Sequence, residues 1–206
     1  MTGFYIISVR EMIKAFQDLK DGGENKLNAI LSTFSCTLNP DIEFFLHKKS
    51  VLFENQSLSR TFLVMASFQN NPVIAGYFAL AMKQISIRKE AVSNKMRSRI
   101  RRFAQFDTNS NSFFLPAILV AQLGKNDTYK NLISGDELLY FALEKVKEIQ
   151  NLAGGKLVYV ECEDVDKLKR FYYSNGFVEF GKRDRMKDEI GKIKSSYLVQ
   201  MIKYMK

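Results

Sequence analysis

The chain has 206 residues, of which 46% are hydrophobic and 26% are charged, and its formal net charge is +9. This length supports one sizeable core and predicts a single domain over residues 1–206. Because apolar residues are spread along the chain, the composition excludes a long disordered tail. No apolar run reaches the ~18 residues of a membrane span. We therefore expect a cytoplasmic protein with no membrane partner, whose positive charge favours polyanions.

The N-terminal half predicts one strand, two helices and then two further strands. Asn39 and Pro40 have the chemistry of a helix start, because asparagine caps the first turn and proline suits its first position. Asn70-Asn71-Pro72 has turn chemistry and predicts a hairpin. The expected elements, in order, are strand Phe4–Val9, helix Glu24–Phe34, helix Asn39–Phe53, and strands Thr61–Phe68 and Val73–Met82.

The C-terminal half alternates strands and helices. Leu139, Leu143 and Val146 have the spacing of an amphipathic helix, which Gly154-Gly155 should end. Arg183–Lys194 is charged and is interpreted as a loop or hairpin arm. The order predicts an α/β (α+β) fold with a mixed sheet. The expected elements are strand Phe113–Leu123, loop Gly124–Asn131, helix Asp136–Gln150, strand Leu157–Cys162, helix Asp166–Ser174, and strands Phe177–Phe180 and Tyr197–Tyr204.

A basic segment, Arg88–Arg102, carries seven basic residues against Glu90, a net +6 in 15 residues. Apolar residues recur in and just after it at spacings of four, four and three, which predicts an amphipathic helix. A phosphate-contacting face for nucleic acid, a docking face for an acidic protein and a solvated charged face all remain open. The apolar residues are Val92, Met96, Ile100 and Phe103, and the expected polyanion contacts are Arg97, Arg99, Arg101 and Arg102.

Histidine and cysteine are too sparse for several kinds of site. His47 is the only histidine, so the sequence offers few ligands for a zinc site and a single candidate base for a Ser-His triad. No metal is expected. We interpret His47 as a solvent-exposed helix residue. The two cysteines, Cys36 and Cys162, form no disulfide framework and are interpreted as small buried hydrophobes.

The segment Phe114–Leu139 resembles the cofactor region of the GNAT superfamily of N-acetyltransferases. In that family an apolar strand leads into a loop of the form Q/R-x-x-G-x-G/A and a helix that opens with a leucine pair. The resemblance implies acetyl-CoA, with its pyrophosphate at the unpaired first-turn N–H groups of the helix. It also implies that the pantetheine arm pairs with the preceding strand. The implied cofactor contacts are Leu123, Gly124, Lys125, Lys130, Asn131, Ile133, Ser134, Gly135 and Asp136, with Ile133 where the family has a glycine.

A second patch, Phe171–Phe177, is similar to the family pattern F/L-Y-x-x-x-G-F. The resemblance makes Tyr172 the residue that protonates the departing thiolate, since a phenol with a pKa of ~10 stays protonated at neutral pH. The alternative is an aromatic side chain packed under the sheet. Glu161, at the end of its strand, is the best placed candidate for a general base, and the alternative is a strand-end surface residue.

A third patch, spread over 34–36, 45–46, 59–62 and 74–80, looks like the GNAT branch that includes toxin–antitoxin acetyltransferases. Ala121–Asn126 fits that branch's cofactor strand, with Gln122 in place of arginine. The resemblance implies a GNAT-like, mostly antiparallel sheet flanked by helices, with a basic helical insertion at about 83–112.

The activity implied is direct acetyl transfer from acetyl-CoA to a primary amine, and the branch's toxins act on aminoacyl-tRNA. A protein amine, a small metabolite amine and a non-catalytic binding module with a basic docking surface are the alternatives. Partners left open are tRNA, an antitoxin or other acidic protein, and a second copy of the chain.

Overall fold

The computed structural model describes residues 3–17, 22–186 and 195–205. Contacts divide the chain into two compact units. Unit 1 comprises Met1–Ala81 and Ala121–Leu143, and unit 2 comprises Met82–Val120 and Glu144–Lys206. Three elements contribute residues to both units: strands β3 (Asn71–Arg88) and β5 (Ser112–Lys125) and helix α6 (Gly135–Ala153). The single domain stays a prediction.

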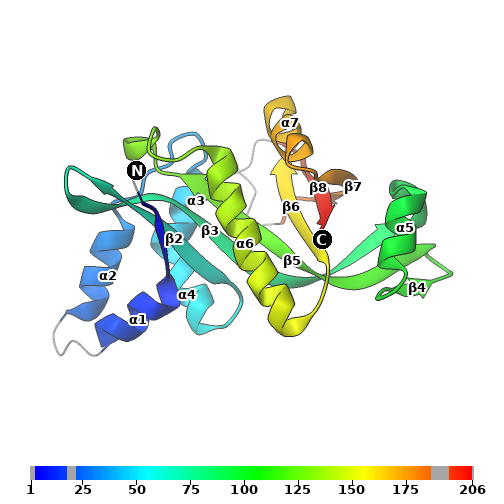
Figure 1. Cartoon of the computed structure of the whole chain (residues 1–206), viewed down its shortest axis with the longest axis horizontal. Coiled ribbons are helices and arrows are strands. Elements are labelled where there is room, and N and C mark those ends of the chain that lie inside the picture. The colour runs from blue at the N-terminus through cyan, green and yellow to red at the C-terminus, as the bar shows by residue number, and fades with distance from the viewer. Residues whose placement is uncertain (1–2, 18–21, 187–194, 206) are drawn as a thin grey trace. The chain divides into compact units, whose positions relative to one another are not determined.

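Unit 1 combines helices with the strand order β1-β2-β3-β5 (Figure 1). The pairs β1–β2 and β2–β3 are antiparallel. Its apolar core includes Leu31, Phe34, Leu46, Leu63 and Tyr77, each at most 1% exposed. Besides the parts of β3, β5 and α6, the elements are β1 (Tyr5–Ser8), α1 (Val9–Gln17), α2 (Gly23–Leu31), α3 (Pro40–Phe44), a π-helix (Phe45–Lys49), α4 (Ser50–Asn55), β2 (Arg60–Phe68) and a 3-10 turn (Asp127–Tyr129).

The β2–β3 hairpin confirms the predicted pair of strands and moves its turn. Phe68 pairs with Asn71, so the loop is Gln69-Asn70, and both residues have positive φ angles of 50° and 63°. Two-residue loops of this kind match the twist of antiparallel strands, and asparagine tolerates the conformation. The turn therefore begins one residue earlier than expected, and Asn71 and Pro72 already belong to β3.

The helical region after Asn39 begins as predicted, because the Asn39 side chain accepts a hydrogen bond from the Asp41 N–H at 3.2 Å. It continues through the π-helix to Asn55, two residues beyond the expected end. Ser50 donates to the Leu46 carbonyl oxygen at 2.6 Å within this region. Both Leu46 and Ser50 are buried.

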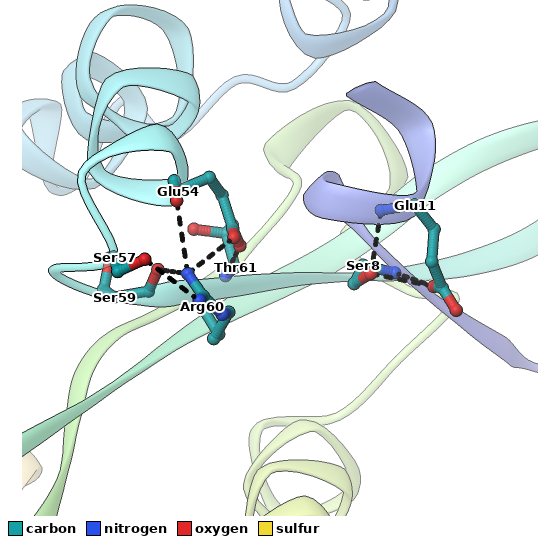
Figure 2. Close-up of polar contacts among 7 residues, drawn as sticks. All are labelled: Ser8, Glu11, Glu54, Ser57, Ser59, Arg60 and Thr61. Atoms are coloured by element: carbon teal, nitrogen blue, oxygen red, sulfur yellow. Dashed lines mark hydrogen bonds and ion pairs between the residues drawn. The ribbon is translucent and has the colours of Figure 1, made fainter. Parts of the chain in front are cut away.

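Helix α1 was not expected, yet a sequence signal for it exists. Ser8 and Glu11 form a reciprocal capping box: the Glu11 carboxylate accepts the Ser8 N–H at 2.9 Å, and the Glu11 N–H donates to the Ser8 hydroxyl at 3.1 Å. The spacing Ser-x-x-Glu marks such a helix start. Figure 2 shows this pair on β1 and α1.

The carboxylate of Glu54 fixes the start of β2, and Figure 2 shows its contacts. Glu54, 2% exposed, accepts the Thr61 N–H at 2.6 Å and an Arg60 guanidinium N–H at 3.1 Å. Burial raises the pKa of Glu54, and the Thr61 N–H and the Arg60 charge offset part of that rise. The network joins the end of α4 to the first residues of β2.

Unit 2 has the strand order β3-β5-β6-β8-β7, with β4 on β5 (Figure 1). The pair β5–β6 is parallel, and β4–β5, β6–β8 and β7–β8 are antiparallel. This mixed, mostly antiparallel sheet with flanking helices confirms the predicted fold class. Its further elements are a 3-10 turn (Lys89–Ala91), α5 (Asn94–Ile100), β4 (Gln105–Asp107), β6 (Leu157–Glu163), α7 (Asp166–Ser174), β7 (Val178–Asp184) and β8 (Tyr197–Tyr204).

The predicted helix over Arg88–Arg102 is wrong in its extent. Strand β3 continues to Arg88, and α5 spans only Asn94–Ile100. Ile85 and Ile87 are buried while their neighbours are exposed, which is the period of a strand. The segment at 83–112 is therefore a strand extension, a short helix and a returning strand rather than one helix.

The remaining C-terminal predictions hold with small shifts. Helix α6 ends at Ala153, and Gly154 and Gly155 follow with φ angles of 80° and 91°. Of the expected loop Arg183–Lys194, the first two residues belong to β7, and residues 187–194 lie outside the described residues. In the part of the chain that the structure describes, no helix has the length and apolar character of a membrane span.

Candidate functional site

The end of β5 is the backbone part of the candidate site. Its parallel pairing with β6 ends at Val120 and Val160, while β5 itself continues to Lys125. The expected loop at Gly124–Asn131 thus begins two residues later, because Gly124 and Lys125 are strand residues. In unit 1 the hydrogen-bonded neighbour of this final stretch is β3. Leu123 and Lys125 are half-buried, and Gly124 is buried.

Gly124 is explained by packing. A Cβ atom at this position would lie 2.4 Å from the Ile42 side chain and 3.3 Å from the Phe34 ring. Only a residue without a side chain lets α3 approach β5 this closely. Gly124, which the resemblance places among the cofactor contacts, therefore has a structural role in unit 1.

Asn126 follows β5 and is completely buried. Its side-chain oxygen accepts the N–H groups of Ser35 (3.2 Å) and Thr128 (3.1 Å). Its side-chain nitrogen donates to the carbonyl oxygens of Ile74 (2.8 Å) and Thr33 (3.3 Å). One side chain thus fixes the loop after β5 to β3 and to the segment before α3, a role that sequence reasoning missed.

Asp127 makes a second connection to the same segment. Its carboxylate accepts both the Thr37 N–H (2.6 Å) and the Thr37 hydroxyl (2.7 Å). Its own N–H donates to the Ser35 carbonyl oxygen at 2.8 Å. The Thr37 hydroxyl bond is the main cause of the lowered pKa of Asp127. Together with Asn126, these bonds hold the loop in one conformation at neutral pH.

The start of α6 has a capping box that the sequence analysis did not consider. The Glu137 carboxylate accepts the Ser134 N–H at 2.8 Å, and the Glu137 N–H donates to the Ser134 hydroxyl at 3.1 Å. The Ser134 N–H bond is the main cause of the lowered pKa of Glu137. The negative charge of this carboxylate therefore offsets part of the positive potential at the N-terminus of α6.

The other predicted loop residues differ in exposure. Ile133 is 2% exposed, so its side chain belongs to the core. Gly135 is the first residue of α6, as expected. The loop bears its basic charge on Lys130, which is exposed and helps to lower the pKa of Asp127 after the Thr37 bonds. Asn131 and Asp136 are also exposed.

Tyr172 lies on α7 in unit 2 and is 8% exposed. Its ring contacts Phe171 and Phe177 edge-on, with centroids 5.0 Å and 5.5 Å away. Burial raises the pKa of the phenol strongly, and the nearby Cys162 adds to the effect. The phenol is therefore protonated throughout the neutral range, which both a packing role and a hydrogen-bond donor role require.

Glu161 lies on β6 and its carboxylate is engaged on both oxygens. One oxygen accepts two guanidinium N–H groups of Arg183, both at 2.8 Å. The other accepts the Gln200 side-chain N–H at 2.9 Å. The predicted role of Glu161 as a general base stays a prediction, and its contacts describe an ion pair between β6 and β7, the two strands that flank β8.

The four predicted polyanion arginines separate into two pairs. Arg97 donates to the Val92 carbonyl oxygen at 3.0 Å, and the Arg99 guanidinium lies 4.8 Å from the centre of the Tyr204 ring. Arg101 and Arg102 are exposed at the end of α5. The first pair is held within unit 2, and the second faces solvent.

His47 and the two cysteines complete the comparison with the sequence. His47 is half-buried, and its Nε2 lies 2.9 Å from the Phe34 carbonyl oxygen, so the expectation of a solvent-exposed side chain is wrong. Cys36 and Cys162 are buried free thiols, as expected. Burial raises the pKa of both, to about 11 for Cys162.

The fold resembles that of several toxins of known structure. A bacterial toxin aligns over 100% of this chain and 92% of its own, with 17% identity and a TM-score of 0.62. AtaT complexed with acetyl-methionyl-tRNAfMet aligns over 82% and 85%, with 16% identity and a TM-score of 0.58. AtaTR bound with AcCoA aligns over 95% and 91%, with 15% identity and a TM-score of 0.53.

At these identities the similarity establishes the fold, and it confirms the mixed, mostly antiparallel sheet flanked by helices that the sequence predicts. No protein-family model matches the sequence, and a search of curated proteins finds no match.

Proposed function

We propose that the chain is an acetyl-CoA-dependent N-acetyltransferase that acts on a primary amine by direct attack. The observation that carries the proposal is the final stretch of β5, which continues to Lys125 beyond its last parallel pair with β6. A strand edge of this kind suits the amide groups of a pantetheine arm, which would pair with Leu123–Lys125 as an added strand does. The fold similarity to AtaTR bound with AcCoA supports the same conclusion.

The start of α6 suits the phosphates of acetyl-CoA only in part. Lys130 is exposed on the preceding loop and supplies positive charge. Glu137, however, competes for the helix N-terminus through its capping bonds with Ser134. We therefore expect acetyl-CoA to bind mainly through the β5 backbone, with a weaker contribution from the helix.

Acetyl-CoA, when bound, supplies a thioester: the amine nitrogen bonds to the carbonyl carbon, and the carbon–sulfur bond breaks. Tyr172 would donate a hydrogen bond to the departing sulfur, because its raised pKa keeps the phenol protonated. The amine proton has to reach solvent or a base. Glu161 is the candidate base, and its carboxylate already accepts bonds from Arg183 and Gln200.

As acceptor we propose the amine of aminoacyl-tRNA. Unit 2 holds 22 basic and 12 acidic residues, a net +10, whereas unit 1 holds 9 and 10, a net −1. Such a surplus attracts a polyphosphate chain. The fold similarity to AtaT complexed with acetyl-methionyl-tRNAfMet supports this acceptor. An antitoxin or other acidic protein is the alternative partner for the same charge.

Calorimetric titration with acetyl-CoA tests the donor. Saturable binding below millimolar concentration is expected, and no heat at millimolar acetyl-CoA would overturn the proposal. Release of the CoA thiol in the presence of aminoacyl-tRNA, but not of free amino acid, would then identify the acceptor.

A second candidate function, a non-catalytic module with a basic docking surface, is favoured by the capped start of α6 and the buried Ile133. RNA binding without any acetyl-CoA binding would establish it.

A further inference from the structure

Unit 2 contains a surface hollow of about 230 Å³ between the end of α5 and the end of α6. It lies apart in the sequence from every residue proposed above for acetyl-CoA. Its lining combines one aromatic ring, two lysines, two carboxamides and two glycines, and includes no acidic residue. These residues are Phe103, Lys147, Gln150, Asn151, Gly154, Gly155 and Lys156.

Phe103 forms the aromatic wall and is 37% exposed. Its position is fixed by the turn that ends α5, where the N–H groups of Phe103 and Ala104 both donate to the Ile100 carbonyl oxygen, at 3.1 Å and 3.0 Å. Ile100 is completely buried and anchors that turn. The sequence placed Phe103 in the same apolar seam as Ile100, yet its ring remains partly in solvent at the rim of the hollow.

The opposite wall is the end of α6 and the turn after it. Gly154 and Gly155 have positive φ angles, and a Cβ atom at either position would meet nothing within 4 Å. The Gln150 side chain reaches the Leu157 carbonyl oxygen at 3.4 Å, and the Lys156 carbonyl oxygen accepts the Met205 N–H at 2.8 Å. The wall is therefore anchored to β6 and the chain end after β8, and it leaves open space beside the two glycines.

The charge around the hollow is positive. Lys147 and Lys156 line it. The pKa of the half-buried Lys203 is lowered, mainly by burial and secondarily by the positive charge of the nearby Lys147. Lys147 pairs with Glu144 at 2.5 Å on the helix surface, which offsets part of its charge. Arg101 and Arg102 directly precede Phe103 and are exposed.

We propose that this hollow binds a nucleotide of a single-stranded RNA segment, whose base stacks on Phe103 while its phosphates contact Lys147 and Lys156. The side-chain amides of Gln150 and Asn151 supply donors and acceptors for a base edge. An aromatic face beside cationic side chains is the usual combination for single-stranded nucleic acid. The choice of RNA as occupant rests on the proposed function, and an acidic peptide would use the lysines without the ring.

Fluorescence anisotropy with a short labelled single-stranded RNA, in the absence of acetyl-CoA, tests the inference on the full chain. Phe103→Ala should weaken RNA binding about tenfold, and Phe103→Trp should retain it, because base stacking needs a ring. The double variant Lys147→Gln/Lys156→Gln should make RNA affinity less dependent on salt. The negative slope of log association constant against log salt concentration should become shallower by about 1.4, because two phosphate contacts are lost.

Matched controls come from unit 1. Phe44 is 41% exposed, so Phe44→Ala removes a similar ring, and Lys26→Gln/Lys48→Gln removes two exposed lysines. Both should leave RNA affinity within about twofold. A polyglutamate peptide, used as a second probe, should bind at least tenfold more weakly than the RNA.

Unchanged RNA affinity in Phe103→Ala, an equal loss in the unit 1 controls, or polyglutamate binding as tight as RNA binding would each overturn the inference. The result is independent of the acetyl-CoA titration. If the hollow does not bind RNA, the proposal of acetyl transfer is unaffected. If the chain does not bind acetyl-CoA, the proposal of an RNA site in the hollow is unaffected.

Discussion

The two units differ in how they use polar side chains. Unit 1 is close to neutral and buries polar groups in defined hydrogen-bond networks, such as Asn126 with its four partners. Unit 2 carries the net charge of +10 and keeps much of it at the surface, as at Arg101 and Arg102. Directional bonds hold a loop in one geometry, whereas surface charge attracts a partner from many directions. The difference assigns precise positioning to unit 1 and long-range attraction to unit 2.

The largest expected effect tests the rigidity of unit 1. Asn126→Ala leaves two N–H groups and two carbonyl oxygens without their partner, and should lower the free energy of unfolding by about 3 kcal/mol. Denaturant titration followed by circular dichroism measures the loss. Asn25→Ala, at an exposed position of α2, is the control and should change stability by less than about 0.5 kcal/mol. A similar small change in Asn126→Ala would contradict the positioning role.

The second test concerns α7 in unit 2. Tyr172→Phe should lower the turnover of acetyl transfer about 100-fold, because the hydrogen-bond donor to the departing sulfur is lost. The dissociation constant of acetyl-CoA should stay within about twofold. Steady-state kinetics and calorimetry measure the two quantities. Tyr173→Phe, which removes only the exposed hydroxyl bonded to Glu179 at 3.4 Å, serves as the control. A large loss of acetyl-CoA affinity in Tyr172→Phe would instead assign Tyr172 to packing.

The third test uses the two capping boxes of unit 1 as a matched pair. Glu137→Gln should tighten acetyl-CoA binding about two- to fivefold, since it removes a negative charge from the helix end proposed to face the phosphates. Glu11→Gln changes the same motif on α1 and should leave acetyl-CoA affinity unchanged. Equal affinities of the two variants would place the phosphates away from α6.

The smallest effect concerns the network in Figure 2. Because burial raises the pKa of Glu54 above its ordinary value of 4.5, the folded state binds this proton more tightly than the unfolded state. The contribution of Glu54 to stability is therefore full below about pH 4.5 and is lost as the pH rises through the folded-state pKa. Glu54→Gln should remove that part of the pH dependence. Denaturant titrations at a series of pH values give the free energy of unfolding at each pH. If this free energy changes with pH by the same amount in Glu54→Gln and in the unmodified protein, the interpretation is wrong.

Local patterns predicted much of the fold. The spacing of Leu139, Leu143 and Val146 and the Gly154-Gly155 pair located α6 and its end to within a few residues. The basic segment was misjudged because the spacing of Val92, Met96 and Ile100 indicates one helix, whereas the strand that contains Ile85 and Ile87 continues to Arg88, the first residue of the segment. Helix α1 was missed although Ser8 and Glu11 have the spacing of a capping box.

The site was predicted less completely, because its side chains are organised by distant contacts. Asn126 bonds to Thr33 and Ser35, which lie 93 and 91 positions away in the chain, and no local pattern indicates such partners. Glu161 likewise meets Arg183 only because their strands both flank β8. A periodicity argument places a residue on a strand, whereas its bonding partners depend on the tertiary structure.

The burial of Cys36 and Cys162 has a practical consequence for measuring the proposed activity. Chromogenic thiol reagents react with the thiolate form of a cysteine. The thiols of Cys36 and Cys162 are buried and have raised pKa values. The folded protein should therefore be nearly silent toward such a reagent at neutral pH. A continuous colour signal from free coenzyme A would then report turnover directly, and a sudden rise in background would report unfolding in the same cuvette.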